Sequence, residues 1–376
     1  MIRLGDVATY INGYAFKPKD RGEEGLPIIR IQDLTGNAYD LGFYDGEYPE
    51  KIEINDGDVL ISWSASLGVY VWNRGKALLN QHIFKVAFDK VEIDRNYFVY
   101  AVRYKLAEMG MKTHGATMKH IVKKDFEATQ IPYPSLKKQV EIANNLDKIL
   151  KIIEARKTEL SLLDNLIKAR FVEMFGNPVA NDMGWDTLPL ENICKAIVDC
   201  PHSTPSYTNE DTGFMCIRTS IVKKNKILWD DIEYISEDEF AKRIQRKKPE
   251  IGDIVYTREG AILGIAAIID RDCNVALGQR SMLLSPDIDK CTSEFLCVAM
   301  NSDSFLDNAL RGVSGSASPH INVGDIKAFK MIMPPVELQN QFSDFVKQVD
   351  KSKVAIQAAL DKSQLLFDSL MQKYFG

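Results

Sequence analysis

The sequence predicts an α+β protein in which one plan, a strand-rich domain followed by a long helix, occurs twice. Residues 134–176 and 334–376 align without a gap at an offset of 200 residues, and both have the hydrophobic periodicity of a helix. Short segments rich in β-branched residues and bounded by turn formers recur in the same order before each helix. Because 45% of its 376 residues are hydrophobic, the chain can bury a separate core in each repeat.

Each predicted helix has a narrow apolar seam that requires a partner. Apolar residues recur at alternating steps of four and three, from Ile142 to Met174 and from Phe342 to Tyr374. About eleven turns give each helix a length of about 60 Å. Two polar residues interrupt each seam where the other copy has an apolar one (Arg156, Arg170, Lys353 and Ser363). We therefore expect the helices to pair with each other rather than to pack on two unrelated cores.

The predicted strands follow the same order in both repeats. LPIIRIQDL, with Arg30, corresponds to FMCIRTSIV, with Arg218. A Gly-Asp turn then enters a buried strand at 59–61 and again at 254–256, and each strand runs into a polar loop that contains glycine. A short helical pattern follows at Tyr97–Met109 and at Glu294–Leu310. Last before each long helix, Gly115–Asp125 matches Gly315–Asp325, again at an offset of 200 residues.

Composition and cysteine placement narrow the class of protein. No run of about 18 apolar residues occurs, so we expect no membrane span, and the N-terminal residues lack the core of a signal peptide. All six cysteines lie in the second repeat without a Cys-x-x-Cys pair, which argues against a zinc or disulfide framework shared by the repeats. We expect no metal site and a reduced, cytoplasmic protein.

Catalytic motifs are missing from the sequence. Phosphate-binding, dinucleotide-binding, zinc-protease and serine-hydrolase motifs do not occur. A catalytic constellation shared by both copies should also appear twice, and none does. We therefore expect no catalytic residue in this chain and no cofactor bound by it.

Charge is distributed unevenly along the chain. The net charge is −5, which argues mildly against nucleic acid, but residues 112–124 and 242–248 are basic and contain no acid. A local basic face on an acidic chain is what we expect of a DNA reader that works with more basic partners.

Polar loops that recur in both repeats supply the candidate DNA-binding residues. Glycine-rich loops offer backbone N–H groups, hydroxyls and a histidine to phosphate oxygens; these residues are Thr117, Lys119, His120, Ser316, Ser318 and His320. Side chains of the kind that read base edges follow the strands; these are Ser62, Ser64, Gln81, His82, Arg258, Gln279 and Arg280. Arg30, Arg218, Ser203 and Thr204 complete the set. The alternative for each is an ordinary capping, packing or surface role.

The motifs together resemble the specificity subunits of type I restriction–modification systems, over the whole length of the chain. The resemblance rests on Gly-Tyr-Ala-Phe-Lys-Pro at 13–18, the segment 199–206, the Gly-Asp strands, Asn80-Gln81-His82, the paired Gly…His-Ile loops and the Pro-x-x-x-x-Gln helix starts. It implies target-recognition domains at 1–134 and 177–334, with a linker at 177–187. These would be separated by helices 135–176 and 335–376 that form an antiparallel coiled coil, in a pseudo-two-fold molecule.

The same resemblance implies partners. Each recognition domain would read one half of a split site in double-stranded DNA, and the helices would dock methyltransferase subunits, two of them, which bind S-adenosylmethionine. A restriction and translocase subunit would join the complex. Because the openings GYAFKPKD and DCPHSTPSY diverge, the two half-sites should differ in sequence.

Two other functions are compatible with the residues alone. One is a methyltransferase or nuclease with unfamiliar motifs, although the two repeats leave no room for a catalytic domain. The other is a coiled-coil scaffold whose end domains bind proteins or other ligands such as sugars. Salt-dependent retention on duplex DNA would separate a DNA reader from such a scaffold.

Overall fold

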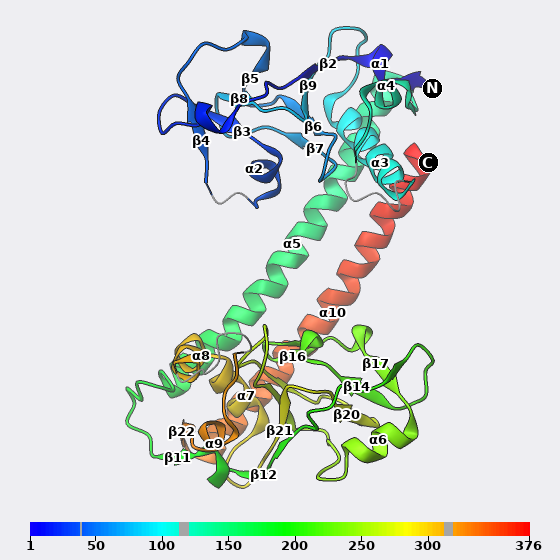
Figure 1. Cartoon of the computed structure of the whole chain (residues 1–376). Helices are drawn as coiled ribbons and strands as arrows, with labels where there is room; N and C mark the ends of the chain where they lie inside the picture. The colour runs from blue at the N-terminus through cyan, green and yellow to red at the C-terminus, as the bar shows by residue number, and fades with distance from the viewer. Residues whose placement is uncertain (38–39, 113–119, 312–318) are drawn as a thin grey trace. The chain divides into compact units, whose positions relative to one another are not determined.

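The computed structural model describes residues 1–37, 40–112, 120–311 and 319–376 (Figure 1). The chain divides into two compact units: unit 1 is Met1–Lys157 with Ala358–Gly376, and unit 2 is Thr158–Gln357. Each unit holds one strand-rich domain and one half of each long helix, α5 (Leu136–Phe175) and α10 (Val336–Phe375). The expected α+β class with long helices is confirmed. In the described part of the chain, no helix is long and apolar enough to cross a membrane.

The domain of unit 1 is built from two four-stranded sheets. Their strand orders are β2-β9-β6-β7 and β4-β3-β8-β5, and the one parallel pair among these strands is β3 with β8. A short ladder, β1 with β10, joins the start of the chain to the start of α5. The strands are β1 (Ile2–Arg3), β2 (Thr9–Asn12), β3 (Leu26–Ile29), β4 (Gly42–Tyr44), β5 (Glu53–Ile54), β6 (Val59–Ser62), β7 (Gly68–Val71), β8 (Ala77–Leu79), β9 (Ile83–Ala87) and β10 (Gln130–Ile131). The helices are α1 (Leu4–Val7), α2 (Ile31–Thr35), α3 (Arg95–Lys112) and α4 (Lys123–Ala128).

Unit 2 repeats this plan. Its sheets have the orders β12-β21-β18-β19 and β13-β17-β14-β20, again with one parallel pair, β14 with β20, and β11 pairs with β22. The strands are β11 (Thr187–Pro189), β12 (Cys194–Asp199), β13 (Tyr207–Thr208), β14 (Met215–Ile217), β15 (Val222–Lys223), β16 (Lys226–Ile227), β17 (Glu233–Ile235), β18 (Ile254–Thr257), β19 (Ala266–Ile268), β20 (Val275–Leu277), β21 (Ser281–Pro286) and β22 (Lys330–Ile332). The helices are α6 (Glu237–Arg243), α7 (Ser293–Asn301), α8 (Asp303–Leu310) and α9 (Val323–Lys327).

Two details differ from the sequence prediction. The helical pattern at Glu294–Leu310 is two helices, because Ser302 caps α8 by accepting a hydrogen bond from Phe305 N at 3.3 Å. Arg30 and Arg218 lie just after β3 and β14 rather than within the strands. Both changes reflect local caps that hydrophobic periodicity does not reveal.

Buried glutamines attach the start of each long helix to its domain. In unit 1, Gln139 Oε1 accepts from Asp94 N at 2.9 Å and Nε2 donates to Pro134 O at 2.9 Å. In unit 2, Gln339 Oε1 accepts from Thr292 N at 3.0 Å and Nε2 donates to Pro334 O at 2.9 Å. The repeated Pro-x-x-x-x-Gln motif is therefore structural, since both amides satisfy backbone groups in the core.

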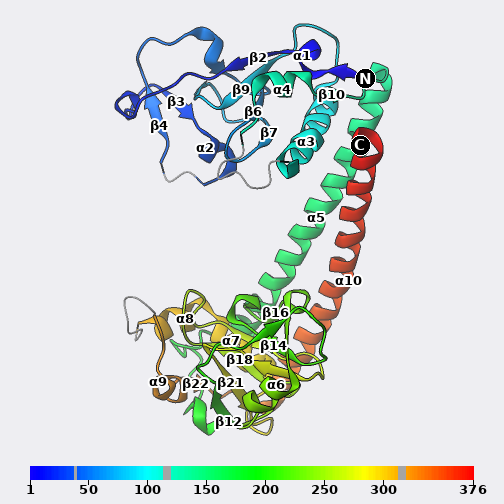
Figure 2. The same ribbon diagram turned by 45° about the vertical axis from the view of Figure 1, so that its right-hand side comes forward.

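The end of each long helix packs against a helix of the other repeat's domain: α10 ends on α3 in unit 1, and α5 ends on α7 in unit 2. In unit 1, the last turns of α10 run beside α5 (Figure 2). The ring of Phe375, at the end of α10, lies 5.2 Å from that of Tyr97 in α3. In unit 2, Phe175, at the end of α5, lies 4.9 Å from Phe295 in α7. Within each unit, the start of one long helix thus packs beside the end of the other, so the two run antiparallel there.

The predicted seam faces the partner helix. Every seam position, including the four polar ones, is buried or half-buried. The polar positions Arg156 and Ser363 meet in unit 1, where the guanidinium donates to Ser363 Oγ and to the carbonyl of Ala359. In unit 2, Lys353 Nζ lies 2.7 Å from Asp164. Polar groups that interrupt the apolar seam thus find partners across it.

Candidate nucleic-acid interface

Both domains place a three-residue turn where the chain passes from one sheet into the other. In unit 1 this sheet-junction turn is Asn80–His82, between β8 and β9. In unit 2 it is Gly278–Arg280, between β20 and β21. Motifs that the sequence analysis identified separately converge on this turn in each unit.

Backbone hydrogen bonds join the turn to the loop that follows the buried strand β6 or β18, which we call the strand-exit loop (residues 63–67 and 258–265). In unit 1, Trp63 N donates to His82 O at 3.3 Å, and Ile121 N donates to Trp63 O at 2.9 Å. In unit 2, Arg258 N donates to Arg280 O at 3.1 Å, and Ile321 N donates to Arg258 O at 2.9 Å. The repeated His-Ile pairs therefore hold the strand-exit loops in place.

His82 and Arg280 occupy the same unusual backbone conformation. Their φ angles are 71° and 70°, in the left-handed region that few residues other than glycine adopt. Such conformations persist where the surrounding structure holds them, and they gather at functional sites. At matched positions of two domains, the conformation presents a histidine in one and an arginine in the other.

The side chains around the turn differ between the units. In unit 1, the ring of Trp63 lies 4.9 Å from that of His82 and 4.8 Å from that of His120. In unit 2, the residue matching Trp63 is Arg258, whose Nε and Nη2 donate to the Asp199 carboxylate at 2.9 and 3.2 Å. His202 Nε2 lies 3.1 Å from the same carboxylate. One backbone scaffold therefore carries an aromatic cluster in unit 1 and an ion-pair cluster in unit 2.

The segments that open the two domains, 13–16 and 199–204, lie against the same turns. In unit 1, Gln81 N donates to Tyr14 O at 2.9 Å, and a Cβ at Gly13 would lie 1.9 Å from Asn80 O, so only glycine fits. In unit 2, Cys200 N donates to Ser281 O at 3.2 Å, and Thr204 Oγ1 donates to Gln279 Oε1 at 2.9 Å. Each opening segment, turn and strand-exit loop therefore form one surface.

Comparison with known proteins identifies the family of the chain. The family model described as "Type I restriction modification DNA specificity domain" matches residues 1–163 and 183–364. The chain belongs to this family. Its relatives include the EcoBI specificity subunit of Escherichia coli, 24% identical over 411 residues that cover 100% of this chain and 85% of the relative. The MjaVIII specificity subunit of Methanocaldococcus jannaschii is 23% identical over 372 residues, covering 93% and 85%.

Solved structures share the fold of this specificity subunit. The S subunit of M. genitalium aligns with a TM-score of 0.55 at 14% identity, over 100% of this chain and 95% of that one. A chain from a study of assembly of the type I restriction–modification system aligns with a TM-score of 0.57 at 16% identity, over 100% and 96%. Family membership favours DNA recognition over the scaffold alternative, and it confirms that the subunit recognises DNA rather than catalysing a reaction.

Several predicted residues of the specificity subunit lie at this surface. Gln81, His120, Ser203, Thr204 and Arg280 are exposed, and His82, Gln279 and His320 are half-buried. Thr117, Lys119, Ser316 and Ser318 lie outside the described residues. For all the residues named in this paragraph, a role in binding DNA stays a prediction.

Other predicted residues are engaged within their own domain. Ser62 is fully buried and donates to Ser66 O at 2.6 Å, and Ser64 is 7% exposed. Arg30 pairs with Asp33 at 3.1 Å, and Arg218 pairs with Glu233 at 2.9 Å. These partners limit the freedom of the side chains to contact a base.

The basic segment 242–248 is not the open basic face that the sequence predicted. Arg243 has a side chain that is 1% exposed and pairs with Glu239 at 2.8 Å. Its Nη2 donates to Ser203 O at 2.8 Å, and Arg246 Nη1 donates to Asp199 O at 3.1 Å. Lys247 pairs with Glu250 and Asp253. Arg243 and Arg246 therefore support the opening segment through its backbone carbonyls, and acids near in sequence pair with Arg243 and Lys247.

Sequence reasoning missed the residues that organise the surface. Asp199 and Arg243 hold the opening segment of unit 2, and Trp63 lies between the two histidines of unit 1. Tyr14, which is 44% exposed beside the turn, adds an aromatic face. Its place in the Gly-Tyr-Ala-Phe motif was a signal for it, and Asp199 and Arg243 lie in the segments 199–206 and 242–248 that the sequence marked, whereas no local pattern marks Trp63.

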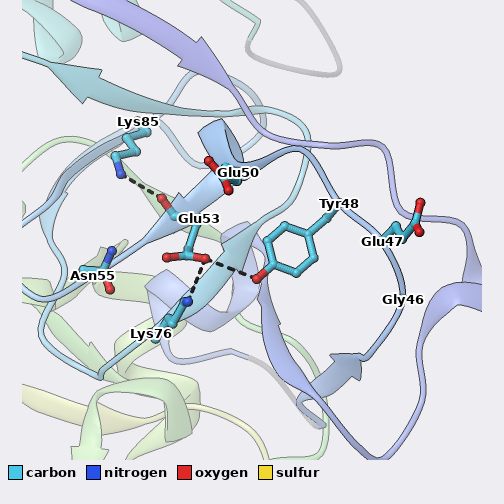
Figure 3. A pocket seen from close by; sticks show the side chains of 8 residues that line it. All are labelled: Gly46, Glu47, Tyr48, Glu50, Glu53, Asn55, Lys76 and Lys85. Atoms are coloured by element: carbon cyan, nitrogen blue, oxygen red, sulfur yellow. Dashed lines mark hydrogen bonds and ion pairs between the residues drawn. The ribbon is translucent and has the colours of Figure 1, made fainter.

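Unit 1 also has a polar depression of about 790 Å³, lined by Glu53, Lys76 and Tyr48 among others (Figure 3). Its central carboxylate, Glu53, lies 2.9 Å from Lys76 Nζ and accepts from Tyr48 Oη at 3.2 Å. The hydrogen bond from Lys76 lowers the pKa of Glu53. Among the described residues, no group of three or more His, Cys, Asp or Glu could hold a metal ion. We assign no ligand to this depression.

Proposed function

We propose that this specificity subunit recognises a split site in double-stranded DNA, with unit 1 reading one half and unit 2 the other. The observation that carries the proposal is the repeated surface: one backbone scaffold presents different side chains in the two units. Because base edges are read by side chains in the major groove, different side chains on the same scaffold select different half-sites. The two half-sites are therefore unlike in sequence.

The exposed groups indicate which residues contact base edges and which contact phosphates. Gln81 and His82 in unit 1, and Gln279 and Arg280 in unit 2, reach base edges. His120 and His320, with the glycine loops before them, contact phosphate oxygens, which fixes the register of each domain on the duplex. Since the net charge is −5, phosphate neutralisation depends on partner subunits.

The long helices are the proposed docking surface for methyltransferase subunits. In unit 2, Leu162 and Leu166 of α5 are exposed outside the seam, and in unit 1 Leu365 and Leu366 of α10 are exposed. Large exposed apolar side chains mark surfaces that partners cover. We infer two methyltransferase subunits, one for each repeat, which bind S-adenosylmethionine, while this chain binds no cofactor. A restriction and translocase subunit completes a cytoplasmic complex.

Binding of duplex DNA by the chain with and without its methyltransferase subunit tests the proposal. Fluorescence anisotropy with a random-sequence duplex and with a duplex selected by the complex gives both affinities at one salt concentration. The isolated chain should bind weakly and without preference. The complex should prefer the selected duplex by about 10³-fold. Tight, selective binding by the isolated chain that does not change when the partner is added would contradict the proposed dependence on partner subunits.

A further inference from the structure

A two-stranded hairpin of unit 2 carries three lysines in four residues: Lys223, Lys224 and Lys226. It consists of β15 and β16, whose register pairs Lys223 with Lys226 and Val222 with Ile227. Val222 and Ile227 are buried in the core of the domain. Because successive side chains of a strand point to opposite faces, Lys223 and Lys226 both point away from that core, and both are exposed.

The hairpin lies at the same end of its sheet as the sheet-junction turn. Strand β18 lies between β21 and β19, and at this end Thr257 pairs with Ser281 while Tyr256 pairs with Ala266. Ala266 O accepts a hydrogen bond from Asn225 N, at the tip of the hairpin, at 2.9 Å. Two strand spacings place Ala266, which the tip contacts, roughly 10 Å from Ser281, the residue after the turn.

A buried amide holds the tip of the hairpin in this place. Asn301 in α7 is 4% exposed, and its Nδ2 donates to Asn225 Oδ1 at 2.7 Å and to Ala266 O at 2.8 Å. Its Oδ1 accepts from Ala266 N at 3.0 Å. Asn225 has a φ of 61°, a conformation that asparagine tolerates better than most residues. The lysines are therefore carried by a preorganised turn rather than a loose one.

The charge of the hairpin is only partly neutralised. Lys224 Nζ lies 2.8 Å from Asp303, whereas Lys223 Nζ donates to the uncharged carbonyl of Ser220 at 2.9 Å. Within the described residues, no carboxylate forms an ion pair with Lys223 or Lys226. Like charges directly opposite each other on paired strands are destabilising. An anion bound beside both ammonium groups would offset this repulsion, so the pair suits an anionic ligand.

A duplex bound at the turn brings phosphates to the hairpin. The major groove, in which the turn is proposed to read base edges, is about 12 Å wide. A cation roughly 10 Å to the side of the turn therefore meets the sugar–phosphate strand that borders the groove. The matching stretch of unit 1, residues 30–41, forms α2 and contains two aspartates and one arginine, Arg30, which pairs with Asp33.

We propose that Lys223 and Lys226 bind phosphate groups of the DNA strand that borders the half-site of unit 2. The contact is independent of sequence and belongs to unit 2 alone, because α2 of unit 1 offers no such pair of cations. This inference rests on the proposed function and adds to it a phosphate anchor within this chain, beside the charge that the partner subunits supply.

Substitutions that remove charge without shortening the side chains greatly provide the test. The hairpin variant combines Lys223→Gln with Lys226→Gln. The matched control combines Lys195→Gln with Lys290→Gln, which removes the same charge beside Asp287, at the opposite end of β21 from Ser281. Each full-length variant is assembled with the methyltransferase subunit. Fluorescence anisotropy then measures binding to a duplex selected by the wild-type complex and to a random-sequence duplex over a range of salt concentrations.

The hairpin variant should bind DNA with a weaker dependence on salt. The slope of log affinity against log salt concentration should become shallower by about 1.8, because each neutralised phosphate contributes about 0.9. Between about 50 and 200 mM salt, the wild-type complex should lose roughly 12 times more affinity than the hairpin variant. The slope should change equally on both duplexes, and the control should keep the slope of the wild type.

Two further measurements locate the contact. Neutral methylphosphonate linkages that border the half-site relaxed by Arg280→Ala should weaken binding by the wild-type complex and leave the hairpin variant unaffected. The sequences methylated by the hairpin variant should be those of the wild type, since phosphate contacts carry no sequence information. Its thermal unfolding should occur at or above the temperature of the wild type, because a like-charge pair has been removed.

Other results would overturn the inference. An unchanged slope in the hairpin variant, or an equal change in the control, would show that Lys223 and Lys226 do not bind phosphates. New base preferences in one half-site would show that the hairpin reads bases instead. In each of these cases a bipartite wild-type site leaves the proposed function standing. Absence of any half-site among the sequences methylated by the wild-type complex would instead refute the proposed function itself.

Discussion

The guanidinium of Arg258 lies against the carboxylate of Asp199, with Nε 2.9 Å from Oδ1 and Nη2 3.2 Å from Oδ2. The two side chains are 8% and 16% exposed. The pair joins the strand-exit loop of unit 2 to its opening segment. Arg258 therefore stabilises the recognition surface through this ion pair, instead of making the direct base contact that the sequence suggested.

Arg258→Ala should destabilise unit 2 by about 3 kcal/mol, because it leaves the Asp199 carboxylate largely buried without its cation. Thermal unfolding of the purified chain measures the effect. Arg280→Ala is the matched control, since the side chain of Arg280 is 49% exposed, and it should change stability by no more than about 0.5 kcal/mol. Unchanged stability of Arg258→Ala with altered base selection would mean that Arg258 reads DNA directly.

Gln339→Leu should destabilise unit 2 by about 1–3 kcal/mol, because Thr292 N and the carbonyls of Lys290 and Pro334 lose their buried partner. Gln139→Leu should have a similar effect on unit 1. Denaturant unfolding gives both values, and Gln348→Leu on the exposed side of α10 is the control. If all three substitutions have the same small effect, the buried amides do not anchor the helices.

Arg156→Met and Ser363→Ala should be energetically coupled, because the guanidinium of Arg156 donates to Ser363 Oγ across the helix pair. A double-mutant cycle in denaturant should give an interaction free energy of about 0.5–3 kcal/mol. The matched cycle pairs Arg156→Met with Ser352→Ala, whose hydroxyl donates within α10, and should give none. A coupling of zero for Arg156 with Ser363 would show that the helices do not pair as described.

Unit 2 should lose stability as the pH rises above about 8.5. Burial raises the pKa of Cys216 to about 12 and also raises the pKa values of Cys291 and Cys297. A raised folded pKa means that the stabilisation is complete below the unfolded pKa, about 8.5, and is lost as the pH rises toward the folded value. Unfolding between pH 7 and 11 measures this loss, and Cys216→Ala should make it shallower. A Cys216→Ala variant with the same pH dependence as the wild type would contradict this origin.

The sequence predicted the repeat, the seam and the recurrence of polar loops, because each leaves a local pattern or a fixed offset. Periodicity places Ile142 and Phe342 on the seam, and burial of both confirms it. It does not reveal that Asp199 meets Arg258, 59 residues away, because ion pairing across a fold leaves no local signal. Likewise the segment 242–248 looked like a free basic face, whereas Arg243 and Arg246 donate to the carbonyls of Ser203 and Asp199, which lie 40 and 47 residues away in sequence.

Sequencing the sites methylated by the complex of this chain with its methyltransferase subunit tests the central claim most directly. The wild-type chain should yield two unlike half-sites separated by an unread spacer. Arg280→Ala should cost about 1–3 kcal/mol of discrimination in one half-site only, because Arg280 belongs to the surface of unit 2. A single continuous site, or relaxation of both half-sites by Arg280→Ala, would contradict the account in which each unit reads its own half.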